Sequence, residues 1–315
     1  MSARVIALSG GIGGAKLALG LYRVLPAHSL SVIVNCGDDF EHLGLAICPD
    51  LDTTLYTLAG LANPELGWGR RDETWSFMDT LAGLGGPTWF RLGDRDLALH
   101  VQRTQHLAGG QPLSAFIAAA ARHLGIHAEI LPMSDDPVRT RVHTSEGELA
   151  FQDYFVRLRC APKISALTFA GASAARPAAA ALTALGASPQ AIILCPSNPY
   201  LSIDPILAVP GMRGLLRAAG APVIAVSPLV AGAAVKGPTA KIMRELGVPL
   251  SPAAIAHHYA GIIDGLVIDR RDAAAVGEID CHVSVTDTLM NSLADREALA
   301  REVLAFASAL GGRRR

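Results

Sequence analysis

The stretch that decides the fold is residues 4–35, which read RVIALSGGIGGAKLALGLYRVLPAHSLSVIVN. An apolar run at 4–8 predicts a buried strand, and a glycine-rich loop follows at 9–16. Residues 14–25 then carry apolar side chains at helical spacing, and 31–35 form a second apolar run. A strand, a loop, a helix and a strand in this order open a doubly wound sheet. We therefore predict an α/β fold with a mostly parallel sheet.

The rest of the chain continues this pattern after an interruption. Residues 63–110 carry all three tryptophans with many charges and glycines, which predicts loops and short helices over one sheet edge. A helix is predicted at 113–124, a strand at 128–131 and a hairpin over 139–154. The remaining pattern predicts strands at 190–195, 222–227 and 266–268, and helices at 177–185, 212–219, 239–246, 253–259 and 294–310. We predict one domain over 1–315, with an inserted subdomain at 63–160 that covers the substrate site.

Composition argues against several classes of function. Half of the 315 residues are apolar and 17% are charged, as in a folded globular protein. The net charge of −1 gives no bulk attraction to nucleic acid, so no nucleic-acid partner is predicted; the arginines at 313–315 are interpreted as a solvated tail. Prolines and glycines break the uncharged stretches 177–203 and 218–235, so no membrane span is predicted. Five cysteines without a C-x-x-C pair indicate reduced thiols and a cytoplasmic protein.

The glycine loop is not one of the familiar nucleotide-binding fingerprints. Lys16 stands where a dinucleotide-binding G-x-G-x-x-G would place its third glycine, and the loop lacks the Walker A pattern. A glycine-rich turn into a helix N-terminus still favours an anion, because the free amides and the helix dipole point at it. Lys16 adds a positive charge, so we predict contact with a phosphate or another anion. The alternative is a tight structural turn.

An acidic run follows the second predicted strand. Residues 35–52 read NCGDDFEHLGLAICPDLD and contain five carboxylates, namely Asp38, Asp39, Glu41, Asp50 and Asp52. Oxygen-rich sites with one or two carboxylates suit Mg²⁺, which keeps several of its waters. We predict binding of a metal ion or substrate here, with Asp52 also expected as the N-cap of the next helix. The alternative is a set of solvated loop acids.

Two later strand ends also carry polar loops. Ser197 and Asn198 lie between two prolines and offer a hydroxyl and an amide to a polar ligand. Lys236 and Gly237 close a small-residue loop that begins at Ser227, and a lysine there suits a phosphate. Because parallel strands end at one edge of the sheet, we expect these loops to converge with the glycine loop and the acids. Plain turns and a surface lysine are the alternatives.

The tryptophan-rich segment offers flat rings beside cations. Trp68 lies among glycines and arginines, and Trp89 and Arg91 belong to the sequence WFRLGD. Such side chains can stack on a flat ring and grip an anion, or they can form a small satellite core. His100 and His106 are interpreted as structural, without a carboxylate at a helical partner position.

Eight blocks of this sequence resemble the 2-phospho-L-lactate transferase family, the CofD/FbiA type, of coenzyme F-420 biosynthesis. The blocks are SGGIGGAKLALGL at 9–21, NCGDDFEHLGLAICPDLDTTLYTLAG at 35–60, GWG at 67–69, WFRLGDRDLALHVQRT at 89–104, LPMSDDPVRT at 131–140, FQDYFV at 151–156, PSNPYLSIDPIL at 196–207 and SPLVAGAAVKGP at 227–238. They occur in order from end to end, which makes the resemblance very specific. Ile12 and Cys36 depart from the family pattern without touching an expected ligand.

The resemblance implies a reaction and its participants. The terminal hydroxyl of the deazaflavin alcohol Fo attacks the phosphate of a GDP-linked three-carbon acid, GMP leaves, and Mg²⁺ is required. The transferred group is 2-phospholactyl, phosphoenolpyruvyl or phosphoglyceryl, and the sequence leaves this choice open. A Rossmann-like fold with a partly helical insertion and a homodimer are also implied. We expect direct transfer, without a covalent enzyme intermediate.

The resemblance also implies roles for individual residues. Asp52 and Arg91 correspond to Fo-binding positions, and Asp52 and Asp50 are the expected catalytic residues, with Asp52 orienting or deprotonating the hydroxyl. Asp38, Asp39 and Asp50 are the candidates for holding Mg²⁺. The other expected substrate-binding residues are Gly11, Gly13, Gly14, Lys16 and Trp68, and, toward the guanosine diphosphate, Ser197, Asn198, Lys236 and Gly237.

Other functions remain as alternatives. Without the resemblance, the residues suggest a nucleotide-dependent transferase or a dinucleotide-binding oxidoreductase, and the missing third glycine disfavours the latter. A non-catalytic nucleotide- or deazaflavin-binding regulator of the same fold is the alternative to an enzyme.

Overall fold

The computed structural model describes residues 4–64, 68–235 and 237–313, and its centre is a seven-stranded parallel sheet. The strand order is β14-β13-β10-β9-β1-β2-β5, and all six neighbouring pairs are parallel. The strands are β1 (Val5–Ser9), β2 (Leu30–Val34), β5 (Glu129–Pro132), β9 (Ala191–Leu194), β10 (Val223–Val226), β13 (Gly265–Asp269) and β14 (His282–Thr286). The α/β prediction with a mostly parallel sheet is confirmed.

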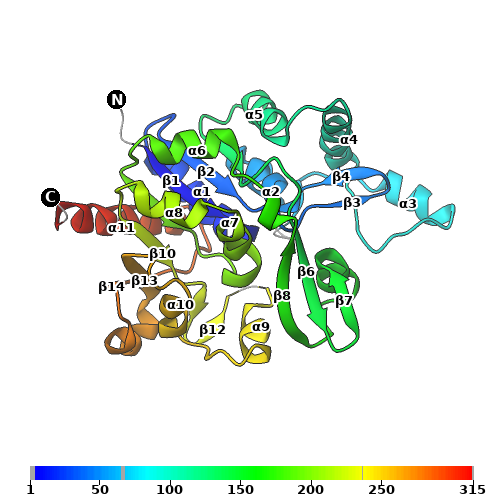
Figure 1. The fold of residues 1–315 in the computed structure, drawn as a ribbon. Coiled ribbons are helices and arrows are strands. Elements are labelled where there is room, and N and C mark those ends of the chain that lie inside the picture. Colours follow the sequence, from blue (N-terminus) through cyan, green and yellow to red (C-terminus); the bar gives the residue numbers. More distant parts are fainter. Residues whose placement is uncertain (1–3, 65–67, 236, 314–315) are drawn as a thin grey trace.

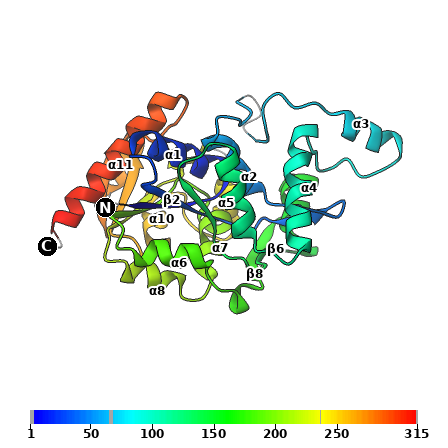
Figure 2. The same cartoon turned by 90° about the horizontal axis from the view of Figure 1, so that it is seen from above.

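Helices cover both faces of the sheet. The helices of the described chain, some of which lie beside the sheet, are α1 (Gly11–Val24), α2 (Pro49–Leu58), α3 (Ser76–Gly83), α4 (Asp94–Ala108), α5 (Leu113–His123), α6 (Ala179–Gly186), α7 (Asp204–Ala208), α8 (Met212–Ala218), α9 (Thr239–Glu245), α10 (Pro252–His258) and α11 (Leu293–Arg313). Figure 2 shows α1 and α11 on one side of the sheet and α6 and α8 on the other. The first and last helices touch closely, because a Cβ built on Gly20 would lie 2.1 Å from the Arg296 carbonyl oxygen. None of the helices in the described part of the chain is long and apolar enough to span a membrane.

Three small antiparallel sheets lie outside the main one (Figure 1). They are β3 (Phe40–His42) with β4 (Leu45–Ile47), β6 (Arg139–Thr144) with β7 (Gly147–Ala150) and β8 (Ile164–Ala170), and β11 (Leu229–Val230) with β12 (Ala233–Ala234). The predicted hairpin at 139–154 therefore exists, and β8 extends it. Residues 63–160 contain β5, which belongs to the central sheet, and β6 and β7, which belong to a small antiparallel sheet. The boundaries of an inserted subdomain therefore stay a prediction.

The acidic run 35–52 contains more regular structure than the sequence predicts. Residues 40–47 form the β3–β4 hairpin, whose tip Leu43-Gly44 has positive φ at both residues, as a type I′ turn requires. The expectation that Asp52 caps the next helix is wrong. Helix α2 begins at Pro49 with Cys48 as its N-cap, because proline has no N–H to lose and its φ is already helical. Asp50 and Asp52 both lie in the first turn.

The order of the strands creates a topological switch point between β1 and β9. The chain builds β2 and β5 on one side of β1, and then β9, β10, β13 and β14 on the other. The loops that leave β1 and β9 touch, because a Cβ on Gly13 would lie 2.4 Å from the Pro196 carbonyl oxygen. Open α/β sheets bind their ligands at such a point, outside the carboxyl ends of the strands.

This contact predicts a specific sensitivity to added volume. We expect Gly13→Ala to lower the free energy of unfolding by about 1–3 kcal/mol, because the methyl group meets backbone that cannot move aside easily. Gly214→Ala in α8 is the matched control, since its Cβ would meet nothing within 4 Å and alanine favours the helix. Chemical denaturation of both variants measures the difference. Equal stabilities would contradict close packing of the two loops.

Candidate functional site

A cavity of about 680 Å³ opens at the switch point. Its walls come from the glycine loop, the acidic run, α4, the loops after β9 and β10, and the segment 288–291 before α11. Most of the sequence-predicted site residues line it, namely Gly11, Gly13, Lys16, Asp38, Asp50, Asp52, Trp68, Arg91, Ser197, Asn198 and Gly237. Gly14 and Asp39 do not line it, and Lys236 lies outside the described residues.

The glycine loop is joined to both neighbouring walls by hydrogen bonds. The Gly10 N–H donates to Ser197 Oγ at 3.3 Å, and the Gly11 N–H donates to Asp50 Oδ1 at 2.8 Å. Gly11 has φ +63°, which glycine adopts without strain. Gly14 has a packing role, because a Cβ there would lie 2.5 Å from the hydroxyls of Ser9 and Ser197. The loop is thus held against the strand end of β9 and the acids.

Lys16 connects the glycine loop to a segment that the sequence did not single out. Its Nζ donates to the Met290 carbonyl oxygen at 2.9 Å. Residues 288–291 lie between β14 and α11 and form one wall of the cavity. Lys16 lines the same cavity as Gly10 and Gly11 at the N-terminus of α1, where an anion is favoured.

The oxygen and the nitrogen of the Asn198 side-chain amide have different roles. Its Oδ1 accepts hydrogen bonds from the Tyr200 and Leu201 N–H groups at 3.0 and 3.2 Å, which shapes the turn after β9. Its Nδ2 is buried and has no hydrogen-bond partner among the described residues. A buried donor without a partner is costly, so this group is suited to a ligand acceptor.

Asp38 and Asp50 form a buried, mutually repelling pair of carboxyl groups. Both are at most 8% exposed. Asp50 accepts hydrogen bonds from Gly11 N–H and Asn35 Nδ2, whereas Asp38 Oδ1 has no partner among the described residues. Burial raises the pKa of Asp50 to about 6. Burial, and then the charge of Asp50, raises the pKa of Asp38 well above its ordinary value. A cation between the two groups would relieve both effects.

Asp39, unlike this pair, does not line the cavity. Burial raises the pKa of Asp39 to about 7, and the nearby charge of Arg139 works against that rise. Since Asp39 does not line the cavity, the structure separates it from Asp38 and Asp50, with which the sequence grouped it.

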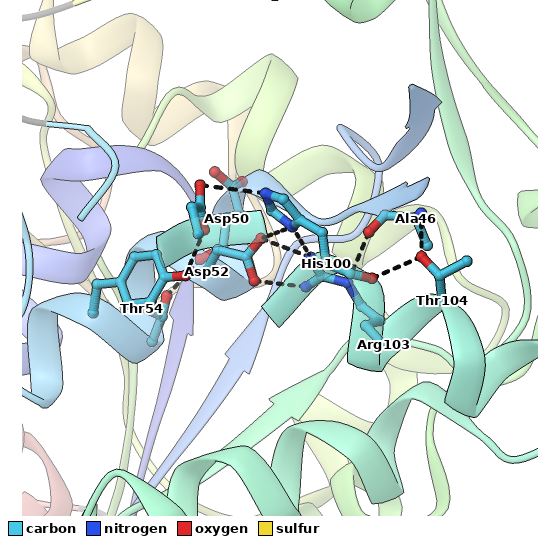
Figure 3. A network of polar contacts seen from close by, with 9 residues as sticks. Ala46, Asp50, Asp52, Thr54, His100, Arg103 and Thr104 are labelled. Carbon is cyan, nitrogen blue, oxygen red and sulfur yellow. Dashed lines mark hydrogen bonds and ion pairs between the residues drawn. The ribbon is translucent and has the colours of Figure 1, made fainter. Parts of the chain in front are cut away.

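Asp52 belongs to a network with residues of α4 (Figure 3). Arg103 donates from Nη1 to Asp52 Oδ1 at 2.6 Å and from Nη2 to Asp52 Oδ2 at 2.9 Å. It also donates from Nε to the Ala46 carbonyl oxygen at 3.0 Å and lies 2.7 Å from His100 Nδ1. Burial disfavours the guanidinium charge, yet Asp52 and the other groups around it raise the pKa of Arg103 above its ordinary value. Such a two-pronged pair fixes the plane of the carboxylate.

His100 extends the network to Asp96 and Tyr56. His100 Nε2 lies 3.3 Å from Asp96 Oδ2, and the Tyr56 hydroxyl donates to Asp96 Oδ1. The interpretation of His100 as lacking a helical carboxylate partner is wrong, because Asp96 is four residues before it on α4. Asp52, Asp96 and His100 lie close enough to hold a metal ion, with ligand atoms within 4.8 Å of one another. Arg103 already supplies a cation to Asp52 and His100 in this arrangement.

The aromatic residues have two roles. Phe90 and Trp75 pack with Ile47, Met78 and Leu92 in a satellite core, as one of the alternatives predicted. The aromatic residues Tyr56, Trp68, Trp89, Phe90, Phe151 and Phe155 line the cavity. The rings of Phe151 and Phe155 are stacked with centroids 5.3 Å apart, and the Arg91 guanidinium lies 3.9 Å from the Trp75 ring centroid. Flat apolar walls therefore stand beside the acids.

Sequence reasoning missed Tyr56, Asp96, His100 and Arg103 as parts of the site. The signal that identifies three of them is their spacing, since Asp96, His100 and Arg103 are separated by four and three residues and share one face of α4. On α2, Asp52 and Tyr56 are four residues apart and therefore also share one face of their helix.

Comparisons with known proteins show the family and the fold of this chain. The family model described as 2-phospho-L-lactate transferase CofD matches residues 5–305. Phosphoenolpyruvate transferase of Streptomyces griseus is 44% identical, over 96% of this chain and 98% of that protein. The protein of the same name from Mycobacterium sp. strain KMS is 37% identical, over 95% and 97%. A crystal structure of a UPF0052-family protein from Bacillus halodurans shares the fold, with a TM-score of 0.64 at 16% identity over 96% of this chain and 99% of that one.

Proposed function

Because this chain belongs to the CofD family of 2-phospho-L-lactate transferases, we propose that the group it transfers is phosphoenolpyruvyl. The chain is a transferase of coenzyme F-420 biosynthesis that moves a phospho-acid from a GDP-linked donor to the deazaflavin Fo. Relatives at 37–44% identity over nearly their whole length carry the name phosphoenolpyruvate transferase, which supports this choice of acid.

One observation carries the assignment of the site. A single cavity joins an anion-favouring end, with the N-terminus of α1 and Lys16, to an acidic end with Asp38, Asp50 and Asp52. A diphosphate suits the first end, and a neutral alcohol that donates hydrogen bonds suits the second. The reacting phosphorus then lies between them, near Gly11 and Asp50, whose hydrogen bond joins the two ends.

We propose that Asp38 and Asp50 hold the magnesium ion that the family implies. The donor set fits, because Asp38 Oδ1 is buried without a partner and Mg²⁺ prefers one or two carboxylates. With magnesium bound, this pair would supply charge neutralisation to the diphosphate and the departing GMP. Asp39 is set aside, because it does not line the cavity.

The chain's own residues position the reactants. The Gly13 backbone and Lys16 bind the phosphates, together with Ser197, Asn198 and Gly237 on the guanosine diphosphate side, while the Gly11 N–H stays bonded to Asp50. Asp52 orients the Fo hydroxyl with a remaining oxygen lone pair, since both of its oxygens already accept from Arg103. Arg91 and Trp68 contact the rest of Fo. The hydroxyl oxygen forms a bond to the phosphorus, the bond to GMP breaks, and the hydroxyl proton leaves to solvent.

Mass spectrometry of the product tests the donor assignment. Purified enzyme is given Fo, Mg²⁺ and, in separate reactions, the GDP-linked forms of phosphoenolpyruvate, 2-phospholactate and phosphoglycerate. We expect phosphoenolpyruvyl-Fo to form with kcat/KM at least about tenfold above the other two, a discrimination that small pocket differences supply. Omission of Mg²⁺ is the control. Preference for another donor would contradict the assignment, and turnover with none would favour a regulator that only binds ligands.

A further inference from the structure

Arg103 is a completely buried cation whose donors are directed at acceptors on three different segments. It is 0% exposed. Its guanidinium contacts the Ala46 carbonyl oxygen at the β3–β4 hairpin, both Asp52 oxygens on α2, and His100 on its own helix α4. Such a group touches no solvent, so its contacts define its role.

The contact with His100 determines which nitrogen of the imidazole carries the proton. A guanidinium has only donors, and its Nη2 lies 2.7 Å from His100 Nδ1. Nδ1 must therefore accept and has no proton of its own. The proton of the neutral ring is then on Nε2, which is buried without a well-aligned hydrogen bond to any described residue and lies 3.3 Å from Asp96 Oδ2.

The same residues tie two helices together above the cavity. Asp52 and Tyr56 are one turn apart on α2, and Asp96, His100 and Arg103 share a face of α4. Arg103 of α4 donates a hydrogen bond to Asp52 of α2, and one turn further along α2 Tyr56 donates a hydrogen bond to Asp96 of α4. Tilting or rotating either helix therefore changes the direction of the Asp52 carboxylate.

We infer that Arg103 is a positioning residue that aims Asp52 at the acceptor hydroxyl, with His100 fixed as its neutral, Nε2-protonated partner. The inference rests on the role proposed for Asp52. Lysine cannot replace this group, because an ammonium lacks the planar fork that meets both carboxylate oxygens and the imidazole together. Neither Arg103 nor His100 needs to contact the GDP-linked donor.

Nitrogen-15 NMR of histidine-labelled protein tests the tautomer without any substrate. The His100 signals are assigned by their disappearance in His100→Gln. In the unsubstituted protein we expect only the Nε2-protonated ring, and in Arg103→Lys we expect a mixture of the two neutral tautomers. A proton on Nδ1 in the unsubstituted protein would overturn the inference. Because this readout does not involve catalysis, it stands even if the proposed donor is wrong.

Kinetics with a matched pair of histidine variants test the positioning role. His100→Asn keeps an acceptor near the Nδ1 position for Arg103, whereas His100→Gln keeps a donor near the Nε2 position for Asp96. We expect His100→Asn to keep kcat within about fivefold. We expect His100→Gln and Arg103→Lys to lower kcat by about 10–100-fold, the range that small misplacement of a reacting group produces. KM for the GDP-linked donor should change less than twofold in all three.

Thermal unfolding separates positioning from simple loss of structure. Arg217→Lys is the control, since Arg217 donates to the Gly261 carbonyl oxygen far from the cavity and its replacement should leave kcat unchanged. Equal kcat values for the two histidine variants, or an Arg103→Lys enzyme with unaltered kcat, would contradict the inference. So would an activity loss that only follows the fraction of folded protein.

Discussion

Replacing Asp38 with asparagine is expected to lower turnover by about 10²–10³-fold, the loss that removal of one charge-stabilising group typically causes. Asp38 offers a buried oxygen without a partner to the cavity, and its neighbour Asp50 already shares its oxygens with Gly11 and Asn35. Without the second carboxylate, the pair holds a divalent cation weakly. Steady-state turnover over a range of Mg²⁺ concentrations measures the effect, and high Mg²⁺ should restore part of the activity.

The same substitution should act on stability in the opposite direction. In metal-free protein at neutral pH, Asp38→Asn removes a carboxyl group whose ionisation is opposed in the folded state by burial and by Asp50, so Tm should rise by a few degrees. Added Mg²⁺ should raise Tm of the unsubstituted protein and leave that of the variant nearly unchanged. Asp39→Asn is the matched comparison, one residue away and equally buried. If Asp39→Asn abolishes the Mg²⁺ response and Asp38→Asn does not, the metal is held by Asp39.

Asp52→Asn is expected to lower turnover by about 10²-fold or more, within the range that losses of a proton-accepting or orienting group span. Asparagine keeps one acceptor oxygen but turns an N–H₂ group toward the Arg103 fork, which has only donors. The carboxylate therefore loses both its charge and its fixed plane. Single-turnover rates at saturating Fo and donor isolate the chemical step.

Fo binding and folding must be measured beside that rate. Asp79→Asn, an exposed aspartate on α3 outside the cavity lining, is the control and should keep full activity. If Asp52→Asn retains the rate of the unsubstituted enzyme, Asp52 has no part in the reaction. A rate loss that Fo concentration fully restores would assign Asp52 to binding alone.

The central sheet was predictable because its strands are apolar over their whole length. Runs such as 190–195 and 222–227 are buried on both faces, so local composition alone indicates them. The edge strand β14 escaped prediction, because its sequence HVSVT is mostly half-buried and mixes polar with apolar residues. The β3–β4 hairpin escaped because its strands have only three residues each and their identity depends on the Leu43-Gly44 turn.

Site residues that follow strand ends could be predicted from the sequence. Those whose role depends on a side chain distant in sequence could not. Asp38 and Ser197 stand in loops at the carboxyl edge of the sheet, and Asp50 lies in the first turn of α2; such segments converge in a doubly wound fold. That Asp39 is absent from the cavity lining has no local signal, and the charge that acts on it comes from Arg139, 100 residues away in sequence. From the sequence alone, Arg103 cannot be distinguished from a surface arginine, because its partner Asp52 lies on another helix, α2.

The switch point also sets the timing of assembly during synthesis. The hydrogen bond between Gly10 N–H and Ser197 Oγ joins residues 187 apart in sequence. At translation rates of 5–20 residues per second, roughly 10–40 s pass between synthesis of the glycine loop and synthesis of Ser197, its hydrogen-bond partner. Helix α1 waits longer still for α11, which covers it around Gly20. The nascent chain therefore exposes an apolar helix face for most of its synthesis, and chaperone binding during that interval should favour its N-terminal third.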